Sequence, residues 1–123
     1  MTIVLDHTIV PVRDNEASAR FFARIFDLLY EGTVSRFATV RANDTFVLDF
    51  DTNATFEPHH YAFNVSASEF EAIFQRIKDE GIRYGSTPWS QDDMAIDRRG
   101  GRQRFYFKDP DGHLLEVLSW ARV

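Results

Sequence analysis

The sequence repeats itself, and histidines and carboxylates fall at matching places in the two copies. When His7 is aligned with His60, the segment HTIVPVRDNEASARF falls on HYAFNVSASEFEAIF. A second register sets DTFVLDF on DGHLLEV and so places Asp49 on Glu116. Two copies of one fold would therefore present two imidazoles and two carboxylates at equivalent points, which is the outline of a metal site.

The length of the chain predicts how the two copies are organised. With 123 residues and 44% hydrophobic content, residues 1–123 are expected to form a single domain around one core. Module 1 would span about residues 1–54 and module 2 about residues 58–120. Each module alone is marginal in size, so the two are expected to share a core or an interface.

Charge and composition exclude several classes of function. A net charge of −5 argues against nucleic acid as a partner, because binding to phosphates needs a basic face. The chain has no cysteine, so nitrogen and oxygen atoms must hold any metal. Neither a signal peptide nor an apolar run long enough to span a membrane is apparent. We therefore expect a cytoplasmic protein with no membrane partner.

Hydrophobic periodicity predicts the elements of the first module. Residues 3–12 are expected to form a buried strand that carries His7, and Asp14 or Asn15 is expected to cap a helix over 16–28. Gly32 is expected to break the chain. Segments 36–41 and 44–51 alternate in the manner of an antiparallel hairpin.

The second module shows the same order of signals. The segment YAFNV predicts a strand, and Ser66 with Glu69 fits the capping box of a helix that Gly81 would end. Two final strands, 103–108 and 113–118, flank the turn DPDG. Strand alternation puts His60 on the face opposite Tyr61, and Glu116 on the face opposite Leu115 and Val117. A long polar loop covers 85–102.

The pattern of strand, helix and three strands, repeated once, resembles the vicinal oxygen chelate superfamily, which contains glyoxalases, bleomycin-resistance proteins and extradiol dioxygenases. The segments that carry the resemblance are DH at 6–7, HHYAF at 59–63 and FYFKDPDGHLLEVL at 105–118. The resemblance implies an α+β fold in which two tandem βαβββ modules form a cupped mixed sheet. It also implies a homodimer.

The same resemblance implies the metal ligands. His7, His60 and Glu116 stand where the superfamily's three recurring ligands stand. Two imidazoles and one carboxylate suit Fe, Mn, Ni, Co or Zn rather than calcium. A glutamate in an apolar strand also needs a metal or an arginine as its partner, because burying an unpaired carboxylate costs free energy.

Asp49 occupies the position where glyoxalase I-like members offer a fourth ligand. Aspartate is one methylene shorter than glutamate, so three roles stay open: a direct ligand, a ligand through water, or an acceptor that orients His7. An aspartate that faces solvent beside Asp51 is the structural alternative. The repeat register favours ligation.

Two further features lie near the expected cup. Tyr106 falls where related enzymes place a phenol that faces the substrate, and it joins Glu116 as an expected catalytic residue. The loop before Phe105 would fold over the cup, with Trp89 as an apolar wall and Arg98, Arg99 or Arg102 meeting an anionic group.

The resemblance predicts a metal-dependent enzyme that acts on a small chelating substrate, as a lyase or isomerase or as a dioxygenase. Two alternatives remain open. One is a drug-sequestering protein of the bleomycin-resistance type, which has no ligand set. The other is a thiol transferase of the fosfomycin-resistance type.

Overall fold

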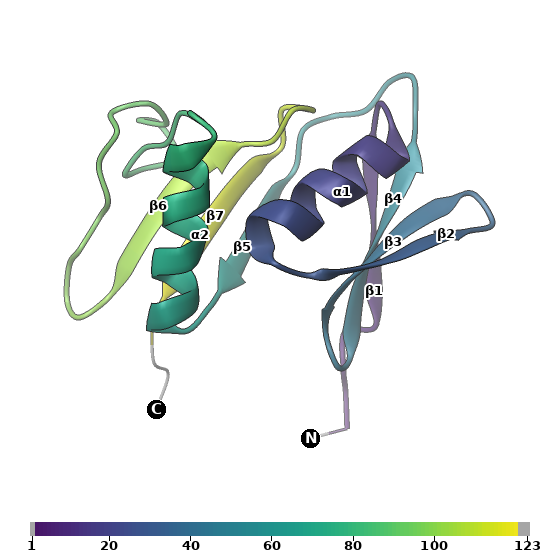
Figure 1. Ribbon diagram of the computed structural model, residues 1–123, viewed down its shortest axis with the longest axis horizontal. Helices are drawn as coiled ribbons and strands as arrows, with labels where there is room; N and C mark the ends of the chain where they lie inside the picture. The colour runs from purple at the N-terminus through teal and green to yellow at the C-terminus, as the bar shows by residue number, and fades with distance from the viewer. Residues whose placement is uncertain (1, 121–123) are drawn as a thin grey trace. The chain divides into compact units, whose positions relative to one another are not determined.

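The computed structural model of the protein describes residues 2–120, which divide into two compact units with the boundary along the chain between Glu57 and Pro58. Each unit is a sheet with one helix packed against it (Figure 1). No described helix has the length and apolar character needed to cross a membrane. A single domain with a shared core remains a prediction.

The first unit contains one helix and four strands. In chain order these are β1 (His7–Val12), α1 (Asn15–Phe26), β2 (Leu29–Val34), β3 (Phe37–Asn43) and β4 (Phe46–Thr52). The strands lie in the order β1-β4-β3-β2. β1 runs parallel to β4, and the other two pairs are antiparallel. This is a complete βαβββ module.

Helix α1 begins and ends on local signals in the sequence. The Asp14 side chain accepts a hydrogen bond from the Ala17 N–H at 3.2 Å, which satisfies one free donor of the first turn and is worth about 1 kcal/mol. The helix ends at Asp27, whose φ of 55° leaves the right-handed region. Its apolar stripe is buried, and Phe22 packs on Phe50 of β4 with ring centroids 4.9 Å apart.

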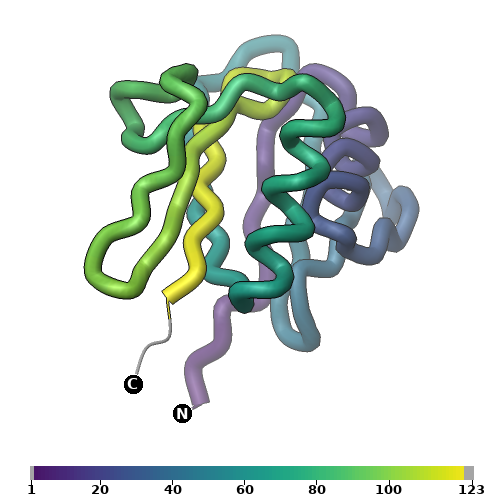
Figure 2. The backbone as a smooth tube through the Cα atoms, turned by 60° about the vertical axis from the view of Figure 1, so that its left-hand side comes forward, coloured from purple at the N-terminus to yellow at the C-terminus, as the bar shows by residue number. Residues whose placement is uncertain are grey.

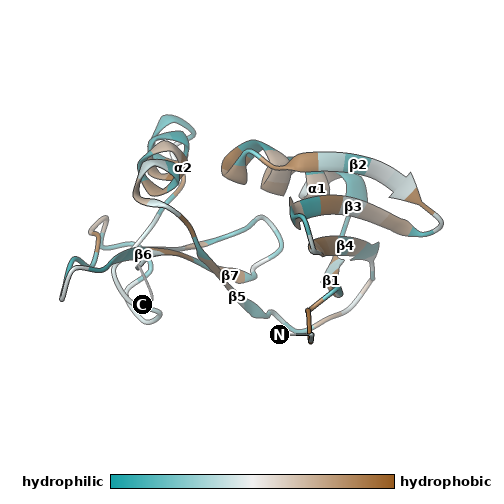
Figure 3. Cartoon of the chain, turned by 90° about the horizontal axis from the view of Figure 1, so that it is seen from below, coloured by the Kyte–Doolittle hydropathy of each residue, from teal (hydrophilic) through white to brown (hydrophobic). Residues whose placement is uncertain are grey.

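The second unit contains β5 (His60–Asn64), α2 (Ala67–Asp79), β6 (Gln103–Lys108) and β7 (Leu114–Ser119). The strand order is β5-β7-β6, with β5 parallel to β7 and β6 antiparallel to it. Figure 3 shows α2 over one face of this sheet, while the other face carries no helix. That helix-free face is called the open face of the unit.

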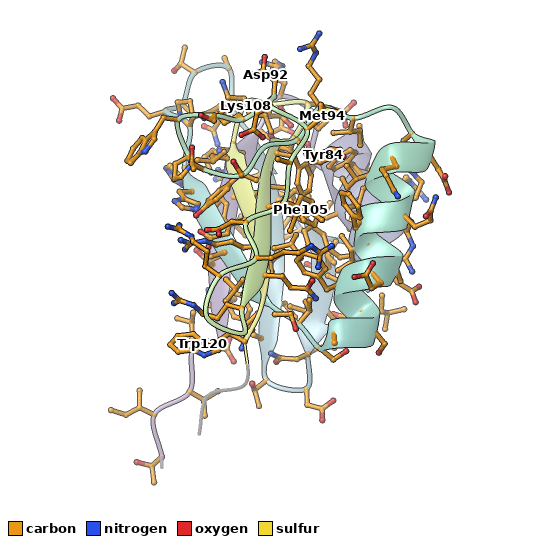
Figure 4. The ribbon with its side chains drawn as sticks, turned by 90° about the vertical axis from the view of Figure 1, so that its left-hand side faces the viewer. Tyr84, Asp92, Met94, Phe105, Lys108 and Trp120 are labelled. Carbon is orange, nitrogen blue, oxygen red and sulfur yellow. The ribbon has the colours of Figure 1, made fainter. Side chains whose placement is uncertain are left out.

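The expected capping box at the start of α2 is confirmed. The Ser66 Oγ accepts from the Glu69 N–H at 3.2 Å, and the Glu69 carboxylate accepts from the Ser66 N–H at 2.8 Å. Gly81, with a φ of 67°, follows the helix as expected. Between sheet and helix, Phe105 packs on Phe70 at 5.3 Å and, with Tyr84, fills the interior of the unit (Figure 4).

Three expectations differ from the structure. The first strand begins at His7 rather than at residue 3, and Ile3, Val4 and Leu5 are exposed. Gly32 does not break the chain: it lies inside β2 beside a β-bulge, where its φ of 89° suits glycine. In the second module, the strand equivalent to β2 is reduced to two isolated bridges, Gly85 to Tyr106 and Asp97 to Arg104.

Residues 86–96 loop out between these two bridges and come after α2 and before β6 in the chain (green in Figure 2). The loop is braced by its own polar groups. Asp93 accepts hydrogen bonds from the Ser86 and Ala95 N–H groups, both at 3.0 Å. A Cβ at Gly85 would lie 1.7 Å from the Ser90 carbonyl oxygen, so only glycine permits the close approach that closes the loop.

Candidate functional site: a histidine and a carboxylate in each module

Cross-strand register places a histidine and a carboxylate at the same relative positions in both units. In the first unit His7 pairs with Val47, and Asp49 lies two residues further along β4. In the second unit His60 pairs with Leu114, and Glu116 lies two residues further along β7. The alignment of His7 with His60 and of Asp49 with Glu116 is therefore an equivalence in space as well as in sequence.

His60 and Glu116 contact one another on the open face of the second unit. The His60 Nε2 lies 3.1 Å from the Glu116 Oε1. Leu115 and Val117, on either side of Glu116, are fully buried on the helix side. Glu116 is itself only 8% exposed, and its contacts with His60 and Arg104 offset the cost of placing a carboxylate there.

A backbone clamp holds His60 in this register. His113 is fully buried, and its Nδ1 accepts a hydrogen bond from the His59 N–H at 2.8 Å. The Leu114 N–H donates to the His59 carbonyl at 2.9 Å. Both backbone groups of His59 are thus tied to the start of β7, which fixes the neighbouring residue, His60, beside Glu116.

Tyr106 lies on the same open face, because it pairs directly with Glu116. Its ring centroid is 6.1 Å from that of His60, and the residue is 3% exposed. Burial, with the nearby negative charge of Glu116, raises the pKa of the Tyr106 phenol. Tyr106 therefore stays protonated at neutral pH and keeps an O–H to donate.

In the first unit His7 has a different carboxylate partner. Its Nδ1 lies 2.8 Å from the Asp6 Oδ2, which leaves Nε2 as the nitrogen for a ligand. The hydrogen bond to Asp6 raises the pKa of His7, and the negative charges of Asp6 and Asp49 act in the same direction. Sequence reasoning noticed the DH pair but missed Asp6 as the residue that orients the ring, the arrangement seen around metal-binding histidines.

Asp49 accepts a hydrogen bond from the Thr39 Oγ1 at 2.7 Å through its Oδ1. Thr39 pairs with Asp49 on β3, just as Tyr106 pairs with Glu116 on β6. The neighbouring Asp51 is 6% exposed and forms an ion pair with Arg36 at 2.6 Å. Arg36 lowers the pKa of Asp51 through that hydrogen-bonded contact.

The long loop places its candidate residues outside the contacts of Glu116. Trp89 is 89% exposed and lies beside Ile82, Arg83 and Lys108 around an open surface hollow. Arg98 hydrogen-bonds the side chain of Gln103, and the Arg102 guanidinium lies 4.8 Å from the centre of the Trp120 ring.

Arg104 is the neighbour of Glu116 that sequence reasoning missed. Its Nη1 lies 3.8 Å from the Glu116 Oε2, and its Nε donates to the Asp97 Oδ2 at 3.1 Å. The alternation of β6 was the available signal, since Arg104 and Tyr106 are two residues apart and so share a face.

Within residues 2–120, no three His, Asp or Glu side chains gather closely enough to form a metal site. His7 and Asp49 belong to the first unit, and His60 and Glu116 to the second. The donor pair of the second unit nevertheless fits a metal. Donors at about 2.1 Å from an ion and at right angles to one another lie roughly 3 Å apart, close to the spacing of the His60 and Glu116 atoms.

The sequence profile of the Glyoxalase/Bleomycin resistance protein/Dioxygenase superfamily matches residues 4–117. The chain belongs to this superfamily. The structure agrees with this match, because the two units share the same parallel register between their first and last strands. The α+β fold of two tandem βαβββ modules is thus confirmed.

Two kinds of relative stand out by sequence identity. Among solved structures, oxidase ChaP-H2 is 38% identical with a TM-score of 0.92, over 98% of this chain and 96% of that one. Oxidase ChaP-H1 is 37% identical with the same TM-score, over 98% of each chain. Glutathione transferase FosA of Serratia marcescens is 30% identical over 92% of this chain and 78% of its own length.

Proposed function

We propose that this protein is a divalent-metal-dependent enzyme that oxidises a small chelating substrate with dioxygen, as a dioxygenase does. The observation that carries the proposal is the His60–Glu116 pair, with donor atoms 3.1 Å apart on a helix-free face and with Tyr106 beside it. Two oxidases that are 37–38% identical over nearly the whole chain support this reaction class over the lyases and isomerases of the superfamily.

His60, Glu116 and His7 are the proposed metal ligands, and Asp49 is a weaker fourth donor. Two imidazoles and a carboxylate suit a first-row metal such as Fe or Mn. A bound metal would act as a Lewis acid, and two neighbouring oxygens of the substrate would chelate it. Asp6 orients His7, and Thr39 holds one oxygen of Asp49 while the other stays available.

Tyr106 is the proposed catalytic acid beside the ligands. It lies on the same face as Glu116 and beside the His60 ring, so the phenol O–H can donate to a substrate oxygen as negative charge develops there. Phe105 and Phe107, on either side of Tyr106, are fully buried on the helix side and fix the direction of its side chain.

The metal is tested first, on protein purified without chelators or a nickel column. We expect about one first-row metal ion per chain by plasma mass spectrometry. His60→Ala and Glu116→Ala should lose it, whereas Glu71→Ala, an exposed carboxylate on α2, should keep it. A wild-type chain without stoichiometric metal, even after incubation with Fe(II) or Mn(II), would leave the drug-sequestering alternative in place of an enzyme.

The reaction class is tested next with isotopically labelled dioxygen and a panel of catechols and related chelating phenols. We expect oxygen uptake by the Fe(II)- or Mn(II)-loaded chain, with label in the organic product. Thiol transfer is the second candidate, favoured by the 30% identity to a glutathione transferase. If the chain consumes glutathione when an epoxide is present and takes up no oxygen with any of the chelating phenols, then thiol transfer is the reaction and oxidation is not.

A further inference from the structure

The side chain of Arg104 places a positive charge on the open face next to the proposed metal ligands. It pairs with Leu118 on β7 and so points to the same face as Tyr106 and Glu116. Its side chain is 35% exposed. Its Nη1 forms an ion pair with the Glu116 Oε2 at 3.8 Å, a distance that is too long for a hydrogen bond.

Asp97 holds the same guanidinium through its Nε atom. The backbones of Asp97 and Arg104 exchange two hydrogen bonds of 3.0 Å, and the Arg104 Nε donates to the Asp97 Oδ2. Arg99 donates two hydrogen bonds of 2.8 Å to the two oxygens of Asp97. These contacts with Arg99 and then Arg104 lower the pKa of Asp97 to about 2.

Two carboxylates, Asp97 and Glu116, lie beside the Arg104 guanidinium. One carboxylate, Asp97, faces two guanidinium groups, and Arg99 already engages both of its oxygens. Glu116 is therefore the second carboxylate on which Arg104 depends, and a metal bound to Glu116 would take up that negative charge and leave Arg104 able to bind another anion. The fold itself does not call for an arginine here, because the equivalent position of the first module, opposite the residue two beyond Asp49, is Phe37.

We propose that Arg104 is a specificity-determining residue that binds an anionic group, such as a carboxylate, on the substrate held at His60 and Glu116. The inference rests on the proposed function and adds a substrate class to it: a chelating molecule with a separate negative charge. The Arg104 Nη1 lies 3.8 Å from the Glu116 Oε2, so the anionic group would lie on the Glu116 side of the bound substrate. A guanidinium pairs with a carboxylate through two parallel hydrogen bonds, which neutral groups do not match.

The test compares two probes that differ only in charge: protocatechuate, which carries a vicinal diol and a carboxylate, and its neutral carboxamide. Calorimetry measures the affinity of each for the full-length chain loaded with Mn(II). In the wild type we expect protocatechuate to bind about tenfold more tightly, the ratio that one charge-assisted hydrogen bond supplies. Arg104→Met should reduce that ratio to about one while leaving the affinity for the carboxamide unchanged.

Three further variants separate charge recognition from structural damage. Arg104→Lys keeps the charge without the planar fork and should keep part of the preference, and Asp97→Asn should weaken it by releasing the guanidinium. Arg83→Met, which removes an exposed arginine of the same unit that pairs with Asp92, should keep the full tenfold ratio. Mn(II) content and thermal melting are recorded for each variant, so that only folded, loaded chains are compared.

The outcomes distinguish this inference from the proposed function. If the wild type shows no preference for protocatechuate, or if Arg104→Met keeps the preference, the role of Arg104 is wrong while the metal site stands. If neither probe binds to the Mn(II)-loaded wild-type chain, the proposed function and the role of Arg104 fall together.

Discussion

The two modules place a histidine and a carboxylate at the same register, yet only one of the two pairs is in contact. In the second module Glu116 reaches the His60 ring at 3.1 Å. In the first module the shorter Asp49 is bonded to Thr39, and His7 turns to Asp6 in the adjacent position of the chain. Glutamate is one methylene group longer than aspartate. Glu116 reaches its histidine, whereas Asp49 and His7 each have another partner.

The residues on the adjacent strand beside each carboxylate also differ between the two modules. Thr39 and Tyr106 are equivalent by register, as are Phe37 and Arg104. The second module therefore has a phenol and a guanidinium where the first has a small hydroxyl and an apolar ring. In the proposed enzyme, the first module would contribute ligands, and the second would contribute ligands together with groups that contact the substrate.

The largest expected effect comes from removing Glu116. Glu116→Ala should abolish stoichiometric metal binding, because it removes a ligand and also the partner of His60. Asp49→Ala should weaken metal affinity by only about tenfold, the lower end of the range for supporting groups. Metal content and competition with a fluorescent chelator measure both. Equal losses in the two variants would show that the modules contribute equally and would contradict the comparison.

A second prediction concerns how the two modules are combined. We propose a homodimer in which His7 of one chain joins His60 and Glu116 of its partner. Mixed His7→Ala and Glu116→Ala chains, each inactive alone, should then regain one working site per heterodimer, measured as metal content and oxygen uptake. Isolating the heterodimer with two different affinity tags provides the control. Absence of recovery in verified heterodimers would place all the ligands of a site in one chain.

Shortening Glu116 tests the role of the single methylene directly. Glu116→Asp makes the second module resemble the first, and we expect it to lose about a hundredfold in metal affinity while keeping the fold, since the charge stays and only its reach changes. The reciprocal variant, Asp49→Glu, should bind metal at least as tightly as the wild type. Unchanged affinity in Glu116→Asp would mean that reach is not what distinguishes the modules.

The smallest effect is expected in the acid stability of the two modules. Arginines lower the pKa of Asp51 in the first module and that of Asp97, to about 2, in the second. Each carboxylate is more acidic folded than unfolded, so its stabilising contribution is complete above about pH 4 and is lost as the pH falls towards 2. Thermal melting between pH 2 and 7 should show a flatter acid limb in Asp97→Asn than in the wild type, and a smaller flattening in Asp51→Asn. Glu71→Gln, the exposed control, should leave the curve unchanged.

Local patterns predicted much of the fold. The capping box at Ser66, the cap at Asp14 and the turn ending at Gly112 depend on residues within one turn of one another, so the sequence encodes them directly. Strand alternation likewise assigned Glu116 to the open face. The loop between Gly85 and Asp97 was harder to interpret, because the second strand of that module is reduced to two isolated bridges with β6.

The sequence by itself determined that the chain is a duplicated module with His7, His60, Asp49 and Glu116 at equivalent positions. Only the tertiary structure decided which of these side chains meet. Contact between His60 and Glu116 depends on the parallel register of β5 and β7 and on the buried His113 that fixes it. The anchoring of Arg104 by Asp97 depends on an isolated bridge across the long loop. Periodicity and capping are local properties of a chain, whereas side-chain reach across strands is set by pairing between residues far apart in sequence.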